Sequence, residues 1–445
     1  MKYSPPIYRN AALILAGLAC AITAQAAPAP AIDPVRTWNE QAITTVRAKN
    51  AIDAAAARLY AMVNIAMYDA VNGIESRHKG KDNRASALVS PNGAPSDGDI
   101  YAAAVAAAHA VLVGVYPDRS PIYDMQRDND LAALGSNNRV AKGEAWGANV
   151  GAQVVAARAN DGSSPPEPPQ PPGSGKGQFR GNFNNPQYRN MQPFGIANSL
   201  VYKGPGPADL MSLDYAVAFY VTKTLGNKLP TTDTPEANAH RDATFKFWAL
   251  GNNTAQPPGA WVQVALDVLS RSALGLEDAT RLMALETMAM ADTVAPTFLT
   301  KYDFHHWRPV DAIHEATTPG DMNDLTDGDP GWMARASAGS PEYWSGHSSF
   351  SAAAATVLAG FFCNDEISFN LTGDPNDPNA AGQTRSFSSF SAAAAEAGIS
   401  RIYGGLHFPF SNTDGLEAGR AIAREILANK LLLLKGDTHF GQCPL

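Results

Sequence analysis

The stretch NAIDAAAARLYAMVNIAMYDAVNGI, residues 50–74, decides the fold class of this chain. Apolar residues recur in it every three to four positions, and Gly73 stands near its end. This spacing is the period of an α-helix that buries one face or more in a core. We therefore predict a long helix from Asn50 to Ile74.

The same period recurs along most of the chain, whereas the alternating pattern of strands is scarce. Thr234 is a plausible N-cap, with Pro235 at the first helical position and Gly251 just past the end. Further helices are predicted over residues 101–116, 276–301, 345–362 and 413–432. The predicted class is mainly α, as helical bundles, most simply two four-helix bundles.

One segment rich in proline and glycine, DGSSPPEPPQPPGSGKGQFRGN at residues 161–182, interrupts the helices. Proline removes backbone donors and glycine adds chain entropy, so this segment is not helical. It separates a helical half ending near residue 160 from a second half, residues 183–445, or it is a long surface loop. We expect residues 27–445 to form a single large domain.

The N-terminus has the pattern of a secretory signal. Lys2 and Arg9 precede an apolar run from Ala11, and Ala24-Gln25-Ala26 has the small residues of a cleavage site. Residues 1–26 are therefore predicted to be a signal peptide, and the protein to be exported, either periplasmic or secreted. No later segment has eighteen uncharged apolar residues in a row, so no integral membrane segment is expected.

Charge narrows the possible partners. Without Lys2 and Arg9 the formal charge changes from −8 to −10. An acidic chain does not suit nucleic-acid binding, which needs a basic face, and any bound anion must be held by a local cluster of cations. Cys363 and Cys443 remain after cleavage; they either pair in an oxidising compartment or stay as free thiols.

Three stretches carry candidate chemistry. KYDFHHWRP places Lys301 and Arg308 seven residues apart, two turns along one helical face, with the helix expected to end just before Pro309. SGHSSFSAAAA puts Ser345, Gly346 and His347 at the start of a helix, where free amides and the dipole favour an anion. SRIYGGLH adds Arg401 and His407: a five-donor fork and a ring nitrogen that serves as nucleophile or metal ligand.

Taken together, the order K-x6-R-P, S-G-H and S-R-x5-H resembles the signature shared by vanadium-dependent haloperoxidases and the type 2 phosphatidic acid phosphatase superfamily. The likeness to the bacterial haloperoxidase branch extends to RTWNEQAI, YAMVNIAMYDAVNGIE and DGLEAGRAIA, and so covers nearly all of the mature chain.

The resemblance implies a role for each of these residues. Lys301, Arg308 and Arg401 would neutralise the oxygens of vanadate, assisted by the Ser345 hydroxyl and the Gly346 amide. His407 would be the vanadium ligand and His347 the acid–base group. Phosphate would compete with vanadate for the site. The residue types agree with these roles, because three cations, a donor pair and two histidines suit a trigonal-bipyramidal oxyanion centre. The transition state of phosphoryl transfer has the same geometry, so one site can serve both chemistries.

Two positions depart from the family pattern. Trp344 stands where proline is usual, and it either lines the pocket or packs against the bundle. Ser411 stands where an aspartate is usual; a carboxylate there would fix the tautomer of the last histidine. We expect Asp414 or a backbone carbonyl to replace it, and we interpret the change as favouring a haloperoxidase over a phosphatase. His305, His306 and His314 lack zinc spacing and are expected to be bystanders.

Three functions remain in competition. The first is an exported haloperoxidase that oxidises halide with hydrogen peroxide to hypohalous acid, which a small organic acceptor consumes. The resemblance places the halide pocket near Phe298, Ser340 and Trp344, and the serine favours iodide or bromide over chloride. The second is a periplasmic acid phosphatase in which His407 forms a phosphohistidine. The third is an oxyanion-binding protein that has lost turnover through the change at Ser411.

Overall fold

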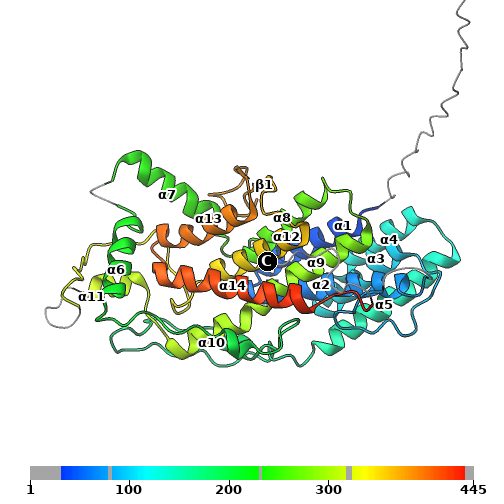
Figure 1. The fold of residues 1–445 in the computed structure, drawn as a ribbon, viewed down its shortest axis with the longest axis horizontal. Helices are drawn as coiled ribbons and strands as arrows, with labels where there is room; N and C mark the ends of the chain where they lie inside the picture. The colour runs from blue at the N-terminus through cyan, green and yellow to red at the C-terminus, as the bar shows by residue number, and fades with distance from the viewer. Residues whose placement is uncertain (1–31, 79–82, 230–232, 317–322, 436–445) are drawn as a thin grey trace, which may run out of the picture. The chain divides into compact units, whose positions relative to one another are not determined.

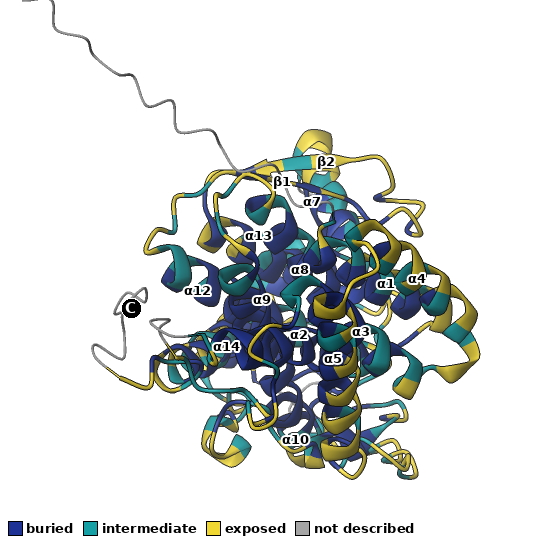
Figure 2. Ribbon diagram, turned by 90° about the vertical axis from the view of Figure 1, so that its right-hand side faces the viewer, coloured by how far each residue is buried: buried dark blue, intermediate teal, exposed yellow. Residues whose placement is uncertain are grey.

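In the computed structural model, helix α2 (Asp53–Glu75) runs through the interior of the protein, and every residue from Leu59 to Glu75 is buried. The structure describes residues 32–78, 83–229, 233–316 and 323–435. Helices α2 and α9 (Leu276–Asp292) lie side by side in Figures 1 and 2, where both are dark blue in the burial view.

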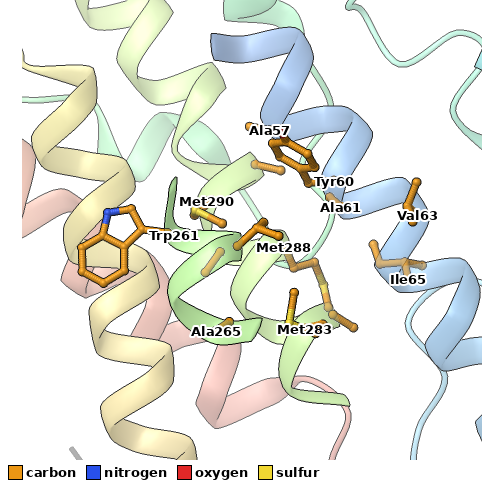
Figure 3. Packing of buried hydrophobic residues seen from close by; sticks show 14 of the residues in the cluster. Ala57, Tyr60, Ala61, Val63, Ile65, Trp261, Ala265, Met283, Met288 and Met290 are labelled. Carbon is orange, nitrogen blue, oxygen red and sulfur yellow. The ribbon is translucent and has the colours of Figure 1, made fainter. Parts of the chain in front are cut away.

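The two helices share one core with α8 (Gln256–Leu269). Figure 3 shows Tyr60 of α2 facing Met288 and Met290 of α9, with Trp261 of α8 beside them. This core draws on residues from Val35 to Leu431, so elements before and after residues 161–182 pack on the same apolar cluster.

The remaining elements surround this centre. The other α-helices are α1 Pro34–Lys49, α3 Ile100–Val115, α4 Ser120–Leu134, α5 Asn138–Ala157, α6 Leu213–Leu225, α7 Pro235–Phe247, α10 Val294–Phe304, α11 Pro309–Glu315, α12 Gly346–Phe362, α13 Phe390–Tyr403 and α14 Pro409–Asn429. Short 3₁₀ turns cover Pro117–Arg119, Pro186–Asn190 and Ser199–Tyr202. Strands β1 (Phe369–Thr372) and β2 (Thr384–Phe387) form an antiparallel pair with Phe369 opposite Phe387.

The prediction of a mainly α protein is confirmed, and several helix limits agree with the sequence. Thr234 caps α7 as expected, since its Oγ1 accepts a hydrogen bond from the Ala237 amide at 3.2 Å. The predicted helix over residues 276–301 is instead two helices, because α9 and α10 are separated at Thr293. Residues 161–182 contain no helix, as expected.

Close backbone packing places α14 against the start of α12. A Cβ on Gly415 would lie 2.7 Å from the Ser345 carbonyl oxygen, and one on Gly419 would lie 2.3 Å from the Ser349 carbonyl oxygen. Only glycine permits this approach, so α14 holds the N-terminus of α12 in place.

Two predictions concern the ends of the chain. Residues 1–26, the predicted signal peptide, and Cys443 lie outside the described residues. Cys363 ends α12 in the left-handed conformation and is disulfide-bonded.

Within the described part of the chain, no single helix has the length and apolar content to cross a bilayer. Helix α3 and the segment Pro117–Leu134 reach that length and apolar content only together, as a pair bent by 118°.

Candidate active site

A cavity of about 660 Å³ brings together six of the seven candidate residues. Its walls include Lys301, Arg308, Gly346, His347, Arg401 and His407. The seventh, Ser345, is buried just beside it and caps α12: its Oγ lies 2.8 Å from the Ser348 Oγ and 3.3 Å from the Ser348 amide. Ser345 is not part of the cavity wall in this structure.

The N-terminus of α12 opens into the cavity. Gly346 is the first helical residue, and its amide belongs to the set that has no partner inside the helix. Gly346 lines the cavity, and a Cβ built on it would make only ordinary van der Waals contacts, 3.8 Å from side-chain atoms of its neighbours. An oxygen atom of a ligand therefore has access to a donor at the positive end of the helix dipole.

Lys301 and Arg308 reach the cavity from two helices instead of one. Helix α10 ends at Phe304, because His305 adopts a left-handed conformation with φ 45°, and Arg308 is the N-cap of α11. The prediction of one helix up to Pro309 was therefore wrong. The segment that ends it is the proline-rich loop: the Phe179 amide donates to the His305 carbonyl, and the Trp307 amide donates to the Gly177 carbonyl.

The two cations are held by backbone carbonyls. Lys301 Nζ donates to the carbonyl oxygens of Pro341 and, at 3.2 Å, Glu342. Arg308 donates from Nε to the Ser340 carbonyl at 2.8 Å and from Nη1 to the Leu406 carbonyl at 2.7 Å. These contacts fix the direction of both charges without neutralising them.

Arg401, in the last turn of α13, has unused donors. Its Nε and Nη1 are buried and have no hydrogen-bond partner among the described residues. Burial and the nearby charge of Arg308 lower its pKa to about 9. Burial likewise lowers the pKa of Arg308 to about 10 and that of Lys301 well below its usual value. A desolvated cluster of three cations with orphan donors is complementary to an oxyanion.

His407 presents an unprotonated nitrogen to this cluster. Its Nδ1 lies 3.0 Å from Glu342 Oε1, and its Nε2 lies 3.0 Å from Arg308 Nη1. Because a carboxylate accepts and a guanidinium donates, Nδ1 carries the proton and Nε2 carries the lone pair. Burial and then the charge of Arg308 lower the pKa of His407 well below its usual value, so the ring is neutral, as a metal ligand or a nucleophile must be.

Glu342 is the functional residue that the sequence analysis missed. Its carboxylate is fully buried, lies 3.0 Å from the Nδ1 atoms of both His306 and His407, and accepts the Phe408 amide at 2.9 Å. Burial alone would raise the pKa of Glu342, but hydrogen bonds from the two histidines hold it well below its usual range. The only sequence signal was its place three residues before Ser345.

This arrangement corrects two expectations. Asp414 accepts from the Tyr343 hydroxyl at 2.7 Å and is not the partner of His407, nor is a backbone carbonyl. The Ser411 hydroxyl is buried without a hydrogen-bond partner among the described residues. His306 is no bystander, because it fixes the second oxygen of Glu342.

The other histidines have separate surroundings. His347 Nε2 lies 3.2 Å from the Ala249 carbonyl, and burial followed by the charge of Arg401 lowers its pKa well below the usual value. His314 Nε2 contacts the Trp332 carbonyl at 2.8 Å. Within the described residues, no group of three or more His, Cys, Asp or Glu side chains is placed to hold a metal ion.

Two of the three halide-pocket candidates line the cavity. Phe298 packs against the rings of Phe183 and Tyr188, and the Ser340 hydroxyl accepts from Arg308 Nη2 at 3.1 Å. Trp344 lies outside the cavity wall: it is buried, and its indole N–H donates to Thr297 Oγ1 at 2.8 Å. Of the two alternatives for Trp344, the structure therefore shows packing against the bundle and not a place in the pocket wall.

A segment of the chain and its overall fold match known proteins. Residues 281–436 match the family described as the VCPO second helical-bundle domain. The first bacterial vanadium-dependent iodoperoxidase superposes with a TM-score of 0.72 at 21% identity, over 91% of this chain and 97% of that one. The holo-type bacterial vanadium-dependent chloroperoxidase gives a TM-score of 0.63 at 16% identity, over 90% and 93%.

The apo-type bacterial vanadium-dependent chloroperoxidase gives a TM-score of 0.61 at 16% identity, over 83% of this chain and 91% of that one. No curated protein matches the chain. The chain therefore has the fold of the bacterial vanadium-dependent haloperoxidases, and its residues 281–436 match the model of the VCPO second helical-bundle domain.

Proposed function

We propose that this protein is a vanadate-dependent haloperoxidase that uses hydrogen peroxide to oxidise halide to hypohalous acid. The observation that carries the proposal is the neutral ring of His407, whose Nε2 lone pair faces a cavity with three buried cations. Solved structures of the same fold are described as a bacterial iodoperoxidase and chloroperoxidases that depend on vanadium.

The residues present fit vanadate. Arg401 offers two orphan donors, Gly346 lines the cavity at the N-terminus of α12, and Lys301 and Arg308 supply charge. His407 Nε2 would hold the metal. Bound vanadate would supply a Lewis acid that activates peroxide towards attack by halide.

The surrounding residues then serve this centre. Glu342 keeps the proton of His407 on Nδ1 and the lone pair on Nε2, which raises the basicity of the ligand. His347 is neutral and lines the cavity, so one ring nitrogen can take a proton from an incoming group and return it to a leaving oxygen. The buried walls strengthen each of these electrostatic contacts.

Halide choice is assigned to the wall formed by Phe298 and Ser340, and we propose iodide or bromide over chloride. Exchanging Ser340 for His or Phe should change the ratio of iodide to bromide oxidation. Because Ser340 also bonds Arg308, Ser340→Ala serves as the control for loss of that bond alone. An unchanged halide ratio in all three variants contradicts this assignment.

A second candidate, acid phosphatase, gains support from Glu342. The interpretation of Ser411 as favouring the haloperoxidase assumed that the last histidine had no carboxylate partner, but His407 has one. A phosphohistidine on Nε2, with His347 protonating the leaving oxygen, is thus chemically equipped. The same observation removes the reason given for an oxyanion-binding protein without turnover.

The deciding experiment measures both activities on one preparation freed of vanadium. Peroxide-dependent oxidation of iodide and bromide should appear after addition of orthovanadate and be absent in His407→Ala. Hydrolysis of a phosphomonoester that vanadate inhibits, with no halide oxidation, would support the phosphatase.

We also propose that the protein is exported, because residues 1–26 have the pattern of a secretory signal. Detection of the mature protein outside the cytoplasm would test this proposal.

A further inference from the structure

An acidic side chain lies among the cations of the cavity. Asp53 is the first residue of α2 and lines the same wall as Lys301, Gly346 and Arg401. It comes from the N-terminal half of the chain, far in sequence from every motif of the site. The carboxylate therefore enters an anion-binding cavity only through tertiary packing.

One oxygen of this carboxylate is unused. Oδ1 accepts the Ala54 amide at 2.8 Å, whereas Oδ2 makes no hydrogen bond to any described residue. Oδ2 lies 3.8 Å from the position that a Cβ on Gly346 would take, so the carboxylate lies beside Gly346 in the cavity wall. A free acceptor thus faces the same volume as the free donors.

Asp53 does not serve as an ion-pair partner for the cations of the cavity. Within the described residues it forms no ion pair with Lys301 or Arg401, whose charges act on it only through space. Lys301 donates to two carbonyls instead, and Arg401 keeps two donors without partners. Burial raises the pKa of Asp53, and the Ala54 amide, Lys301 and Arg401 oppose this rise.

A ligand that satisfies this cavity needs two kinds of oxygen. Oxygens without hydrogen accept from Arg401 and from the Gly346 amide, and one hydroxyl donates to Asp53 Oδ2. A tetrahedral oxyanion that keeps a proton near neutral pH, such as hydrogen phosphate or hydrogen vanadate, has both. Sulfate has the same shape but no proton, so its oxygen would meet the carboxylate as a repulsive, unpaired contact.

We propose that Asp53 is a specificity-determining residue that selects protonated tetrahedral oxyanions and rejects those without a hydroxyl. The proposal rests on the proposed function, because it takes the same cavity as the oxyanion site. Sites that use a buried polar group to recognise a hydroxyl discriminate strongly against analogues without it. The partial opening of this cavity reduces the effect to about 10- to 100-fold, the range of one charge-assisted hydrogen bond.

The test is equilibrium binding of inorganic phosphate and sulfate to the vanadium-free full chain at neutral pH, by calorimetry. The wild type should bind phosphate about 10- to 100-fold more tightly than sulfate. Asp53→Asn removes the charge and offers an amide donor, so its ratio should fall towards one, mainly because sulfate binding improves. Asp53→Ser, which keeps a small polar side chain at the first position of α2, should lose the ratio as well, and thermal denaturation checks that both variants fold.

Asp214→Asn is the matched control, because Asp214 is an exposed acid in the first turn of α6 and lies outside the cavity wall. It should keep the wild-type ratio. Equal binding of both anions by the wild type, or an unchanged ratio in folded Asp53→Asn, overturns the role of Asp53 and leaves the oxyanion site standing. Failure of the wild type to bind phosphate, sulfate and vanadate alike would overturn the oxyanion site and this inference with it.

Discussion

Replacing Glu342 by glutamine changes one atom in a fully buried carboxylate that accepts from two histidines and one amide. A carboxamide has a single acceptor oxygen, so its NH₂ group must face either the Nδ1–H of His306 or that of His407. Two donors then oppose each other, or a ring changes tautomer. If His407 changes, its proton moves to Nε2, where Arg308 Nη1 already donates from 3.0 Å.

The magnitude follows from these contacts. Loss of one charge-assisted hydrogen bond in a buried site costs about 1.5–3 kcal/mol in the free energy of unfolding. Removal of the carboxylate partner of a metal-binding histidine weakens metal affinity by about 10- to 100-fold. Vanadate titration of wild type and Glu342→Gln, with thermal denaturation of both, measures the two effects.

Asp414→Asn is the matched control, because Asp414 is the acid nearest in sequence to Ser411 and, among the described residues, hydrogen-bonds only with the Tyr343 hydroxyl. Its vanadate affinity should stay within about twofold of the wild type, well under the 1.4 kcal/mol that a tenfold change represents. Equal affinities of Glu342→Gln and the wild type would refute the claim that Glu342 holds His407 ready as a ligand.

Three further predictions use the same geometry. Gly346→Ala should fold normally, since its Cβ meets no atom closer than 3.8 Å, but it should weaken phosphate binding about tenfold in calorimetry; normal phosphate binding by this variant contradicts the anion site. By contrast, Gly419→Ala should lower the free energy of unfolding by about 1–3 kcal/mol, because its Cβ would lie 2.3 Å from a carbonyl oxygen. Trp344→Phe loses the hydrogen bond to Thr297 and should lower the free energy of unfolding by about 1 kcal/mol in a denaturant titration. The ratio of iodide to bromide oxidation should stay unchanged, and a changed ratio would show that this side chain reaches the pocket. Because the pKa of His347 is lowered on folding, the unfolded chain binds a proton there below about pH 6.5 that the folded protein excludes. His347 should therefore contribute up to about 1.4 kcal/mol per pH unit to the loss of stability of the vanadium-free protein as pH falls, beside the contribution of His407. His347→Gln should show a shallower slope by up to this amount, and equal slopes in the variant and the wild type would refute the prediction.

The sequence predicted those parts of the molecule that depend on local spacing. The period of residues 50–74 predicted α2, and Ser345 before an alanine-rich run predicted the start of α12. These features are local because helix formation and capping depend on neighbours within a few positions.

What the sequence did not predict depends on contacts between distant segments. Helix α10 ends early because the loop around Gly177 and Phe179 bonds the backbone of residues 305–307. Asp53 reaches the cavity, and Glu342 reaches His407, only through tertiary packing, and no pattern near either residue marks it as part of the site. The absence of an aspartate at Ser411 was therefore misleading, since another element supplies the carboxylate.

The most direct test of the account is a crystal structure of this protein soaked with orthovanadate. We predict vanadium density in the cavity with His407 Nε2 as its nearest protein atom and with oxygens beside Arg401 and the Gly346 amide. Vanadium held by His347, or bound only outside this cavity, would contradict the assignment of His407 as the ligand.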